Sequence, residues 1–160
     1  KTVGLLKNAK RIEIFGMGAS SSIAQDAQHK LFRLGTPTIA YGDHLMQRMA
    51  AAASDQDTAV LIISFTGRTQ AIVDVAAIAK QSGASIVAIT DTESPLANIA
   101  DIAITSGDGL EDTTIYVPMT TRIIILTIID ILATGLALAL GDEGDKKLRK
   151  IKQSLDMTKL

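Results

Sequence analysis

Cysteine is missing from this 160-residue chain, and aromatic residues make up only 3% of it. Without cysteine the chain forms neither a disulfide framework nor a thiolate metal site, which fits a reducing cytoplasm, the compartment we expect. So few aromatic rings do not suit a surface that stacks nucleic-acid bases. The formal net charge of −1 leaves no basic excess. The chain is therefore not expected to grip DNA by itself.

What is present is a large apolar fraction in a length that suits one domain. Apolar residues make up 47% of the sequence, with many Ala, Ile and Leu, which suits close packing of helices on a sheet. The first residue is Lys1 and no secretory signal precedes it, so the opening KTVGLLKNAK reads as the cut edge of a longer protein. We expect residues 1–160 to form one domain, with part of the function in a segment outside them.

Strand and helix patterns alternate along the chain. Short apolar runs typical of buried strands fall at residues 11–15, 37–40, 58–63, 85–90 and 102–105. Helices are predicted at residues 20–34, 45–53, 69–81 and 95–100, then from about residue 120, and finally at 146–155. This order predicts an α/β fold, a single doubly wound, flavodoxin-like domain with a five-stranded parallel sheet flanked by helices.

The stretch from Ile123 to Leu140 is nearly all apolar and about long enough to cross a bilayer. Asp130 in its middle would be costly there, so we interpret the stretch as a helix buried in the core or in a subunit interface. This helix is apolar around most of its circumference, and one chain is not expected to bury so wide an apolar surface. We therefore predict a homo-oligomer, either a dimer or a tetramer, and no membrane partner. Asp at Ile124 or Ile128 is predicted to disrupt assembly.

Two polar, glycine-containing segments come directly after the first and third predicted strands. In open parallel sheets, ligands bind beyond the carboxyl ends of the strands, near the topological switch point. Residues 16–22 read GMGASSS and open a helix, where free amides and three serines can bind a polyol or an oxyanion. A dinucleotide fingerprint would need glycine where Ser21 stands, which weakens that interpretation. A serine-rich helix cap without a ligand is the other alternative.

The second segment, SFTGRT at residues 64–69, packs three hydroxyls, one glycine and one arginine into the start of a helix. Amides, the helix dipole, hydroxyls and the Arg68 guanidinium could converge on a phosphate monoester without a metal. The segment lacks the G-x-x-x-x-G-K-[ST] pattern of a nucleotide-binding P-loop, and an ordinary capped turn is its alternative. Together the two segments predict a site for a phosphorylated small polar molecule.

These motifs, G-x-G-x-S after the first strand and S-x-S-G-x-T after the third, resemble those of the sugar isomerase (SIS) domain, with Thr66 in place of the usual second serine. The resemblance covers nearly the whole chain. It extends to the effector domain of the RpiR family of bacterial transcriptional regulators. The motifs that carry this resemblance are Gly18-Ala19-Ser20, Asp26-Ala27-Gln28, Met46-Gln47-Arg48-Met49, Thr66-Gly67-Arg68-Thr69, Glu111-Asp112-Thr113, Tyr116 with Pro118-Met119, and Ile129-Asp130 with Leu132-Ala133-Thr134-Gly135.

The resemblance implies a function and a ligand. RpiR-family members carry an N-terminal helix-turn-helix domain, so this chain is expected to reach DNA only through a domain outside it. Within the family, the resemblance implies a regulator of central carbon metabolism that binds a phosphorylated sugar acid. The implied ligand is 2-keto-3-deoxy-6-phosphogluconate, an intermediate of the Entner–Doudoroff pathway.

The resemblance also implies which residues meet the ligand. Hydroxyls of the second segment are expected to hold the phosphate, and serines of the first to meet the sugar-acid chain. Arg68 could instead point to solvent, and Gln47 could instead reach a partner subunit. Arg48 or Arg122 could pair with a ligand carboxylate or form a surface ion pair. The full expected ligand-binding set is Ser20, Ser21, Gln47, Ser64, Thr66, Gly67, Arg68, Thr69 and Glu111.

An isomerase of this family would need a base that moves a proton between carbons. Glu111, His29 and His44 are the candidates, but none comes with a convincing acid–base partner, and no cluster of residues indicates a metal site. We therefore predict a ligand-sensing domain that needs no cofactor and is not an enzyme. A phosphosugar isomerase is the alternative.

Overall fold

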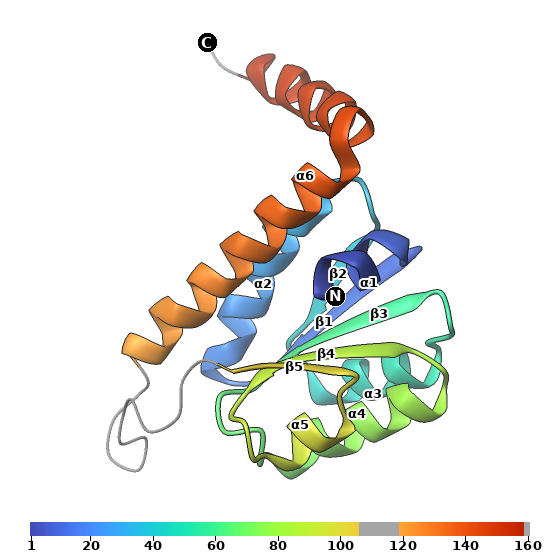
Figure 1. The fold of residues 1–160 in the computed structure, drawn as a ribbon, viewed down its shortest axis with the longest axis vertical. Coiled ribbons are helices and arrows are strands. Elements are labelled where there is room, and N and C mark those ends of the chain that lie inside the picture. Colours follow the sequence, from blue (N-terminus) through green and yellow to red (C-terminus); the bar gives the residue numbers. More distant parts are fainter. Residues whose placement is uncertain (106–118, 159–160) are drawn as a thin grey trace.

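The computed structural model describes residues 1–105 and 119–158 and shows a sheet with helices on both faces (Figure 1). The strands are β1 (Arg11–Gly16), β2 (Thr38–Tyr41), β3 (Thr58–Ile63), β4 (Ser85–Thr90) and β5 (Ile102–Thr105). The helices are α1 (Thr2–Asn8), α2 (Ala19–Phe32), α3 (His44–Ala52), α4 (Gln70–Gln81), α5 (Pro95–Ile99) and α6 (Thr120–Asp156).

All five strands run parallel, in the order β2-β1-β3-β4-β5, which confirms the predicted sheet. After β1 the chain moves outward to β2, then returns to the other side of β1 to form β3 and continues away from it. The switch point therefore lies between β1 and β3, whose last residues, Gly16 and Ile63, pair with each other. This register brings the two polar segments of the sequence to neighbouring strand ends.

Two apolar layers cover the sheet because its central strands are buried on both faces. In β3, the alternation of side chains sends Leu61 and Ile63 to one face and Val60 and Ile62 to the other. The first face packs against α1, α2 and α6, and the second against α3, α4 and α5 (Figure 1). All six β3 residues are buried, as the continuous apolar run predicts.

Helix starts follow their capping residues. The Asp43 carboxylate accepts from the Met46 N–H at 2.9 Å, and the Ser94 hydroxyl accepts from the Ala97 N–H at 3.1 Å. These contacts confirm the predicted starts of α3 and α5. Helix α1 was not predicted, because its seven residues are too few to show a helical period. Its Leu6 is fully buried in the core.

The long apolar stretch forms the first part of α6, which lies beside α2 (Figure 1). The helix breaks at Gly141, where φ is 54°, and the part after the break contains the predicted closing helix at 146–155. By length and composition α6 could cross a bilayer, a test that core helices of soluble proteins also pass. One side is buried in the core through Ile125, Ile129 and Leu136, while Asp130 pairs with Lys30 of α2.

Candidate functional site

A cleft of about 250 Å³ opens at the carboxyl edge of the sheet, between the loops that follow β1 and β3. The structure brings four of the predicted ligand-binding side chains to this cleft. Its lining comprises Met17, Ala19, Ser20, Ile63, Ser64, Phe65, Thr66, Thr69 and Ile72. Four hydroxyl groups thus share one cavity, and no carboxylate is among the described lining residues. Such a lining favours an anion over a cation.

The loop after β3 is fixed by hydrogen bonds to the neighbouring strand and helix. The Ser64 N–H donates to the Ile89 carbonyl at 3.1 Å, and the Phe65 carbonyl accepts from the Asp91 N–H at 2.9 Å. Further along, the Gly67 carbonyl accepts from the Leu96 N–H at 3.2 Å. These bonds hold the backbone of the loop from one side, and the side chains of Ser64, Thr66 and Thr69 line the cleft.

Gly67 is the residue that lets the loop turn tightly. Its φ of 60° lies in the left-handed region, and a Cβ there would come within 2.3 Å of both the Thr90 and Ser94 hydroxyl oxygens. Those two hydroxyls are buried and hydrogen-bonded to each other at 3.2 Å. No other residue type fits this position without displacing them.

Two helices begin beside the cleft. Helix α4 begins after Thr69, whose side chain makes no capping hydrogen bond, and α2 begins after Gly18. In α2 the Ser20 and Ser21 amides already donate to preceding backbone carbonyls, at 3.0 and 3.1 Å. The first amides of a helix have no partner within it, and the helix dipole adds partial positive charge at this end. Together with the hydroxyls of Ser64 and Thr66, the start of α4 has the chemistry that binds a phosphate group.

The loop after β1 brings α2 close to its own strand. A Cβ on Gly16 would lie 2.6 Å from the Ser20 carbonyl oxygen, so only glycine allows this approach. Ser20 lines the cleft, whereas Ser21 lies against Gly42, after β2. The first serine therefore reaches the cleft directly, and the second lies at its β2 side.

Gln47 is predicted to contact the ligand, but it is fully buried beneath the first loop and does not line the cleft. Its amide donates to the Gly16 carbonyl at 3.1 Å and to the Tyr41 carbonyl at 2.6 Å. It thereby ties together the ends of β1 and β2. The structure gives Gln47 a supporting place under the site.

Three predicted ligand-binding residues remain: Gly67, Arg68 and Glu111. Gly67 is a buried residue of the loop itself, as its close contacts require. The Arg68 guanidinium is exposed and donates to the Glu93 carbonyl at 3.1 Å, so it is directed to the β4–α5 loop. Glu111 lies outside the described residues.

Several residues of the site were not identified from the sequence. Thr90 and Ser94 lie beneath Gly67. The signal that could have identified them is a pair of hydroxyl residues, one at the end of the fourth strand and one in the loop after it. Met17, Phe65 and Ile72 belong to the apolar part of the lining, and no motif indicates them. Apolar walls around a few polar groups are typical of small-molecule sites.

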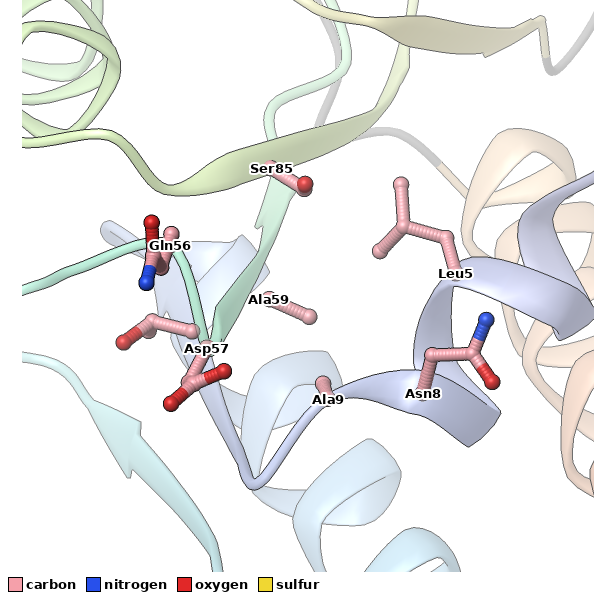
Figure 2. A pocket seen from close by; sticks show the side chains of 8 residues that line it. Leu5, Asn8, Ala9, Gln56, Asp57, Ala59 and Ser85 are labelled. Carbon is pink, nitrogen blue, oxygen red and sulfur yellow. The ribbon is translucent and has the colours of Figure 1, made fainter.

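Another cavity, of about 200 Å³, lies at the opposite, amino edge of the sheet. In Figure 2, Leu5 and Asn8 of α1 lie across the cavity from Gln56 and Ser85. Asp57 at its rim pairs with Lys10 at 2.7 Å. Ligands of open parallel sheets bind at the carboxyl edge, which favours the cleft between the β1 and β3 loops.

Comparison with known proteins identifies the domain. Residues 5–135 match the SIS domain family. The chain is 45% identical over 159 residues to the HTH-type transcriptional regulator HexR of Pseudomonas aeruginosa. The aligned region covers 99% of this chain and 55% of that protein. It is 41% identical over 138 residues to the bifunctional protein glk of Burkholderia thailandensis, covering 86% of this chain and 21% of that protein.

The fold also matches a solved structure, that of the Vibrio vulnificus NanR protein complexed with ManNAc-6P. The TM-score is 0.89 at 20% sequence identity, over 98% of this chain and 59% of that one. At this identity the match concerns the fold. The chain spans about half the length of HexR, which therefore contains a further segment. The predicted resemblance to the SIS domain of a transcriptional regulator is confirmed by these matches.

Proposed function

We propose that this chain, which belongs to the SIS domain family, is the ligand-sensing domain of a sugar-phosphate-responsive transcriptional regulator. One observation carries the proposal. Ser64, Thr66 and Thr69 meet the uncapped start of α4 in a cleft whose described lining holds no carboxylate. Hydroxyls, helix amides and the helix dipole all favour a dianion at that point.

The ligand we propose is a phosphorylated sugar acid, namely 2-keto-3-deoxy-6-phosphogluconate. Its phosphate would sit at the start of α4, and Ser20, with Ser21 beside it, would meet the rest of the chain. The resemblance of the sequence motifs to RpiR-family regulators implies this ligand class, and the similarity to HexR supports a transcriptional regulator. Gln47 and Gly67 would act indirectly, through the backbone that they hold in place. Arg68 would contact the ligand from the rim of the cleft, and Glu111 would contact ligand hydroxyls.

Regulation would pass through subunit packing. We propose a cytoplasmic homo-oligomer, a dimer or tetramer, which acts on DNA through a domain outside this chain. On α6, the side chains of Ile123, Ile131 and Leu138 are 67%, 64% and 79% exposed, respectively. Large exposed apolar side chains in a row favour burial against a second subunit. The ligand would shift transcription only if it binds one packing arrangement better than another.

Calorimetric titration tests the proposal. The wild-type chain should bind 2-keto-3-deoxy-6-phosphogluconate, and Ser64→Ala and Thr69→Ala should each weaken binding by roughly 10- to 100-fold, since a hydrogen bond to a charged group contributes about 1.5–3 kcal/mol. Ser82→Ala is the matched control, because Ser82 lies at the far end of α4 and bonds to the Ile78 carbonyl. Equal affinities for all four proteins would contradict the proposed phosphate site.

The alternative function is a phosphosugar isomerase. Its support is the family name together with Glu111, the candidate base, which lies outside the described residues. Analysis of the ligand after the titration separates the two functions. A sensor returns it unchanged, whereas an isomerase returns a different sugar phosphate and makes Glu111→Gln the next variant.

A further inference from the structure

The cleft continues into a smaller cavity that reaches the first turn of α6. This cavity, of about 30 Å³, is lined by Ala19, Ser20, Ile23, Phe65, Thr121, Arg122 and Ile125. Ala19, Ser20 and Phe65 line both spaces, so the two adjoin along the start of α2. A ligand with its phosphate at α4 and its chain along Ser20 would have its other end here.

Arg122 brings the positive charge to this end. Its Nη2 donates to the Ser22 hydroxyl oxygen at 3.2 Å, and that hydroxyl donates to the Ala19 carbonyl at 2.9 Å. The guanidinium is thereby held beside the first turn of α2, and Arg122 lines the smaller cavity together with Ser20. Among the described residues, no carboxylate lies within ion-pair distance of it. A guanidinium fork that has no acidic partner among these residues is well suited to bind a carboxylate.

Arg48, the other candidate for this role, lies elsewhere. It is exposed on α3, which covers the opposite face of the sheet from α6, and it lines neither cavity. The two arginines are therefore distinguished by position, although the sequence left them equivalent.

We propose that Arg122, positioned by Ser22, is a specificity-determining residue that binds a carboxylate at the end of the ligand opposite its phosphate. The inference rests on the proposed function, since it assumes a phosphate at the start of α4. It predicts that the domain distinguishes a phosphorylated sugar acid from the equivalent phosphorylated sugar alcohol.

A pair of acyclic probes isolates the carboxylate. 6-Phosphogluconate and D-glucitol 6-phosphate share their carbon chain and phosphate, and they differ at C1, which is a carboxylate in one and a CH₂OH group in the other. Calorimetry should show that the wild-type chain binds 6-phosphogluconate about tenfold more tightly, a magnitude that suits a charged hydrogen bond at an exposed position. Arg122→Gln should remove this preference and leave the affinity for D-glucitol 6-phosphate within about twofold.

Control variants separate a specific contact from a general loss of charge. Arg149→Gln makes the same charge change on the exposed second part of α6 and should retain the preference. Ser22→Ala should reduce it by a few fold, because the guanidinium loses its positioning hydrogen bond. Thermal unfolding should be unchanged in Arg122→Gln, whose side chain is exposed.

Each other outcome is informative. If Arg122→Gln weakens both probes equally, or if the wild type shows no preference, the carboxylate subsite is refuted while the phosphate site stands. If Arg48→Gln removes the preference instead, the assignment to Arg122 is wrong. If neither probe nor inorganic phosphate binds to the wild type, the proposed function itself fails and the subsite fails with it.

Discussion

Gly67→Ala tests whether the proposed phosphate loop has the shape described, because two separate costs meet at this residue. The first is conformational: alanine at a φ of 60° costs about 1–2 kcal/mol. The second is steric: the new Cβ would lie 2.3 Å from the Thr90 and Ser94 hydroxyl oxygens, and overpacking of this kind costs about 1–3 kcal/mol. The substitution should therefore lower the free energy of unfolding by about 2–5 kcal/mol.

Three other glycines supply matched controls. Gly18 also has a positive φ, of 54°, but no atom lies within 4 Å of its built Cβ, so Gly18→Ala should show the conformational cost alone. Gly16 has the close contact without the positive φ, so Gly16→Ala should show the steric cost alone. Gly4 has neither, and Gly4→Ala within α1 should stabilise the chain by about 0.5–1 kcal/mol.

Urea unfolding of the four variants measures these costs under identical conditions. The expected order of stability is Gly4→Ala, wild type, then Gly18→Ala and Gly16→Ala, with Gly67→Ala least stable. If Gly67→Ala were no less stable than Gly18→Ala, the Thr90 and Ser94 hydroxyls would not close against the loop, and the reasoning would be refuted. The Thr90–Ser94 contact would then have to open at little cost.

Two further predictions concern a buried carboxyl and the exposed side of α6. Burial raises the pKa of Glu13 above its ordinary value of 4.5, against the opposing effects of Arg11 and Ser54. The stability contributed by protonated Glu13 is fully present below pH 4.5 and is lost as the pH rises through the pKa of the folded state. The free energy of unfolding of Glu13→Gln should therefore rise relative to that of the wild type across this pH range. A difference between the two proteins that does not change with pH would contradict this. Ile131→Asp should disrupt assembly in sedimentation experiments and leave a folded chain, because its side chain is exposed, whereas Leu45→Asp on α3, at a side chain that is 67% exposed, should leave assembly intact. An unchanged oligomer in Ile131→Asp would exclude α6 as the interface.

The sheet could be predicted almost entirely from the sequence because buried parallel strands are short, continuous apolar runs. Strands β3, β4 and β5 begin and end at the predicted residues. Helix ends were predictable where a side chain provides the cap, as with Asp43 and Ser94. Helix α1 was missed because its stability comes from packing against α6 rather than from a pattern of its own, as the buried Leu6 indicates.

The site was predictable where its residues follow a strand and not where they come from distant elements. Ser20, Ser64, Thr66 and Thr69 share the cleft because the sheet order makes β1 and β3 neighbours. Gln47 could not be placed from the sequence, since its amide bonds only to backbone carbonyls that the fold brings within reach.

The interface predictions are refined by the exposure of α6 side chains. Ile124 and Ile128, the two positions chosen from the sequence, are half-buried, and Ile128 packs against the core. Asp at Ile128 would therefore disturb folding as well as assembly. Ile131 is the better probe because its side chain is largely exposed. Helical periodicity across a nearly uniform apolar run could not distinguish these faces.

Backbone amide chemical shifts during titration with 2-keto-3-deoxy-6-phosphogluconate would locate the ligand residue by residue. We expect the largest shifts on residues 64–72, in the loop after β3 and the start of α4, with a second group at residues 18–22. Inorganic phosphate alone should shift the first group and leave the second nearly unchanged. Shifts centred on Asn8, Gln56 and Ser85, around the cavity at the opposite edge of the sheet, would contradict the account.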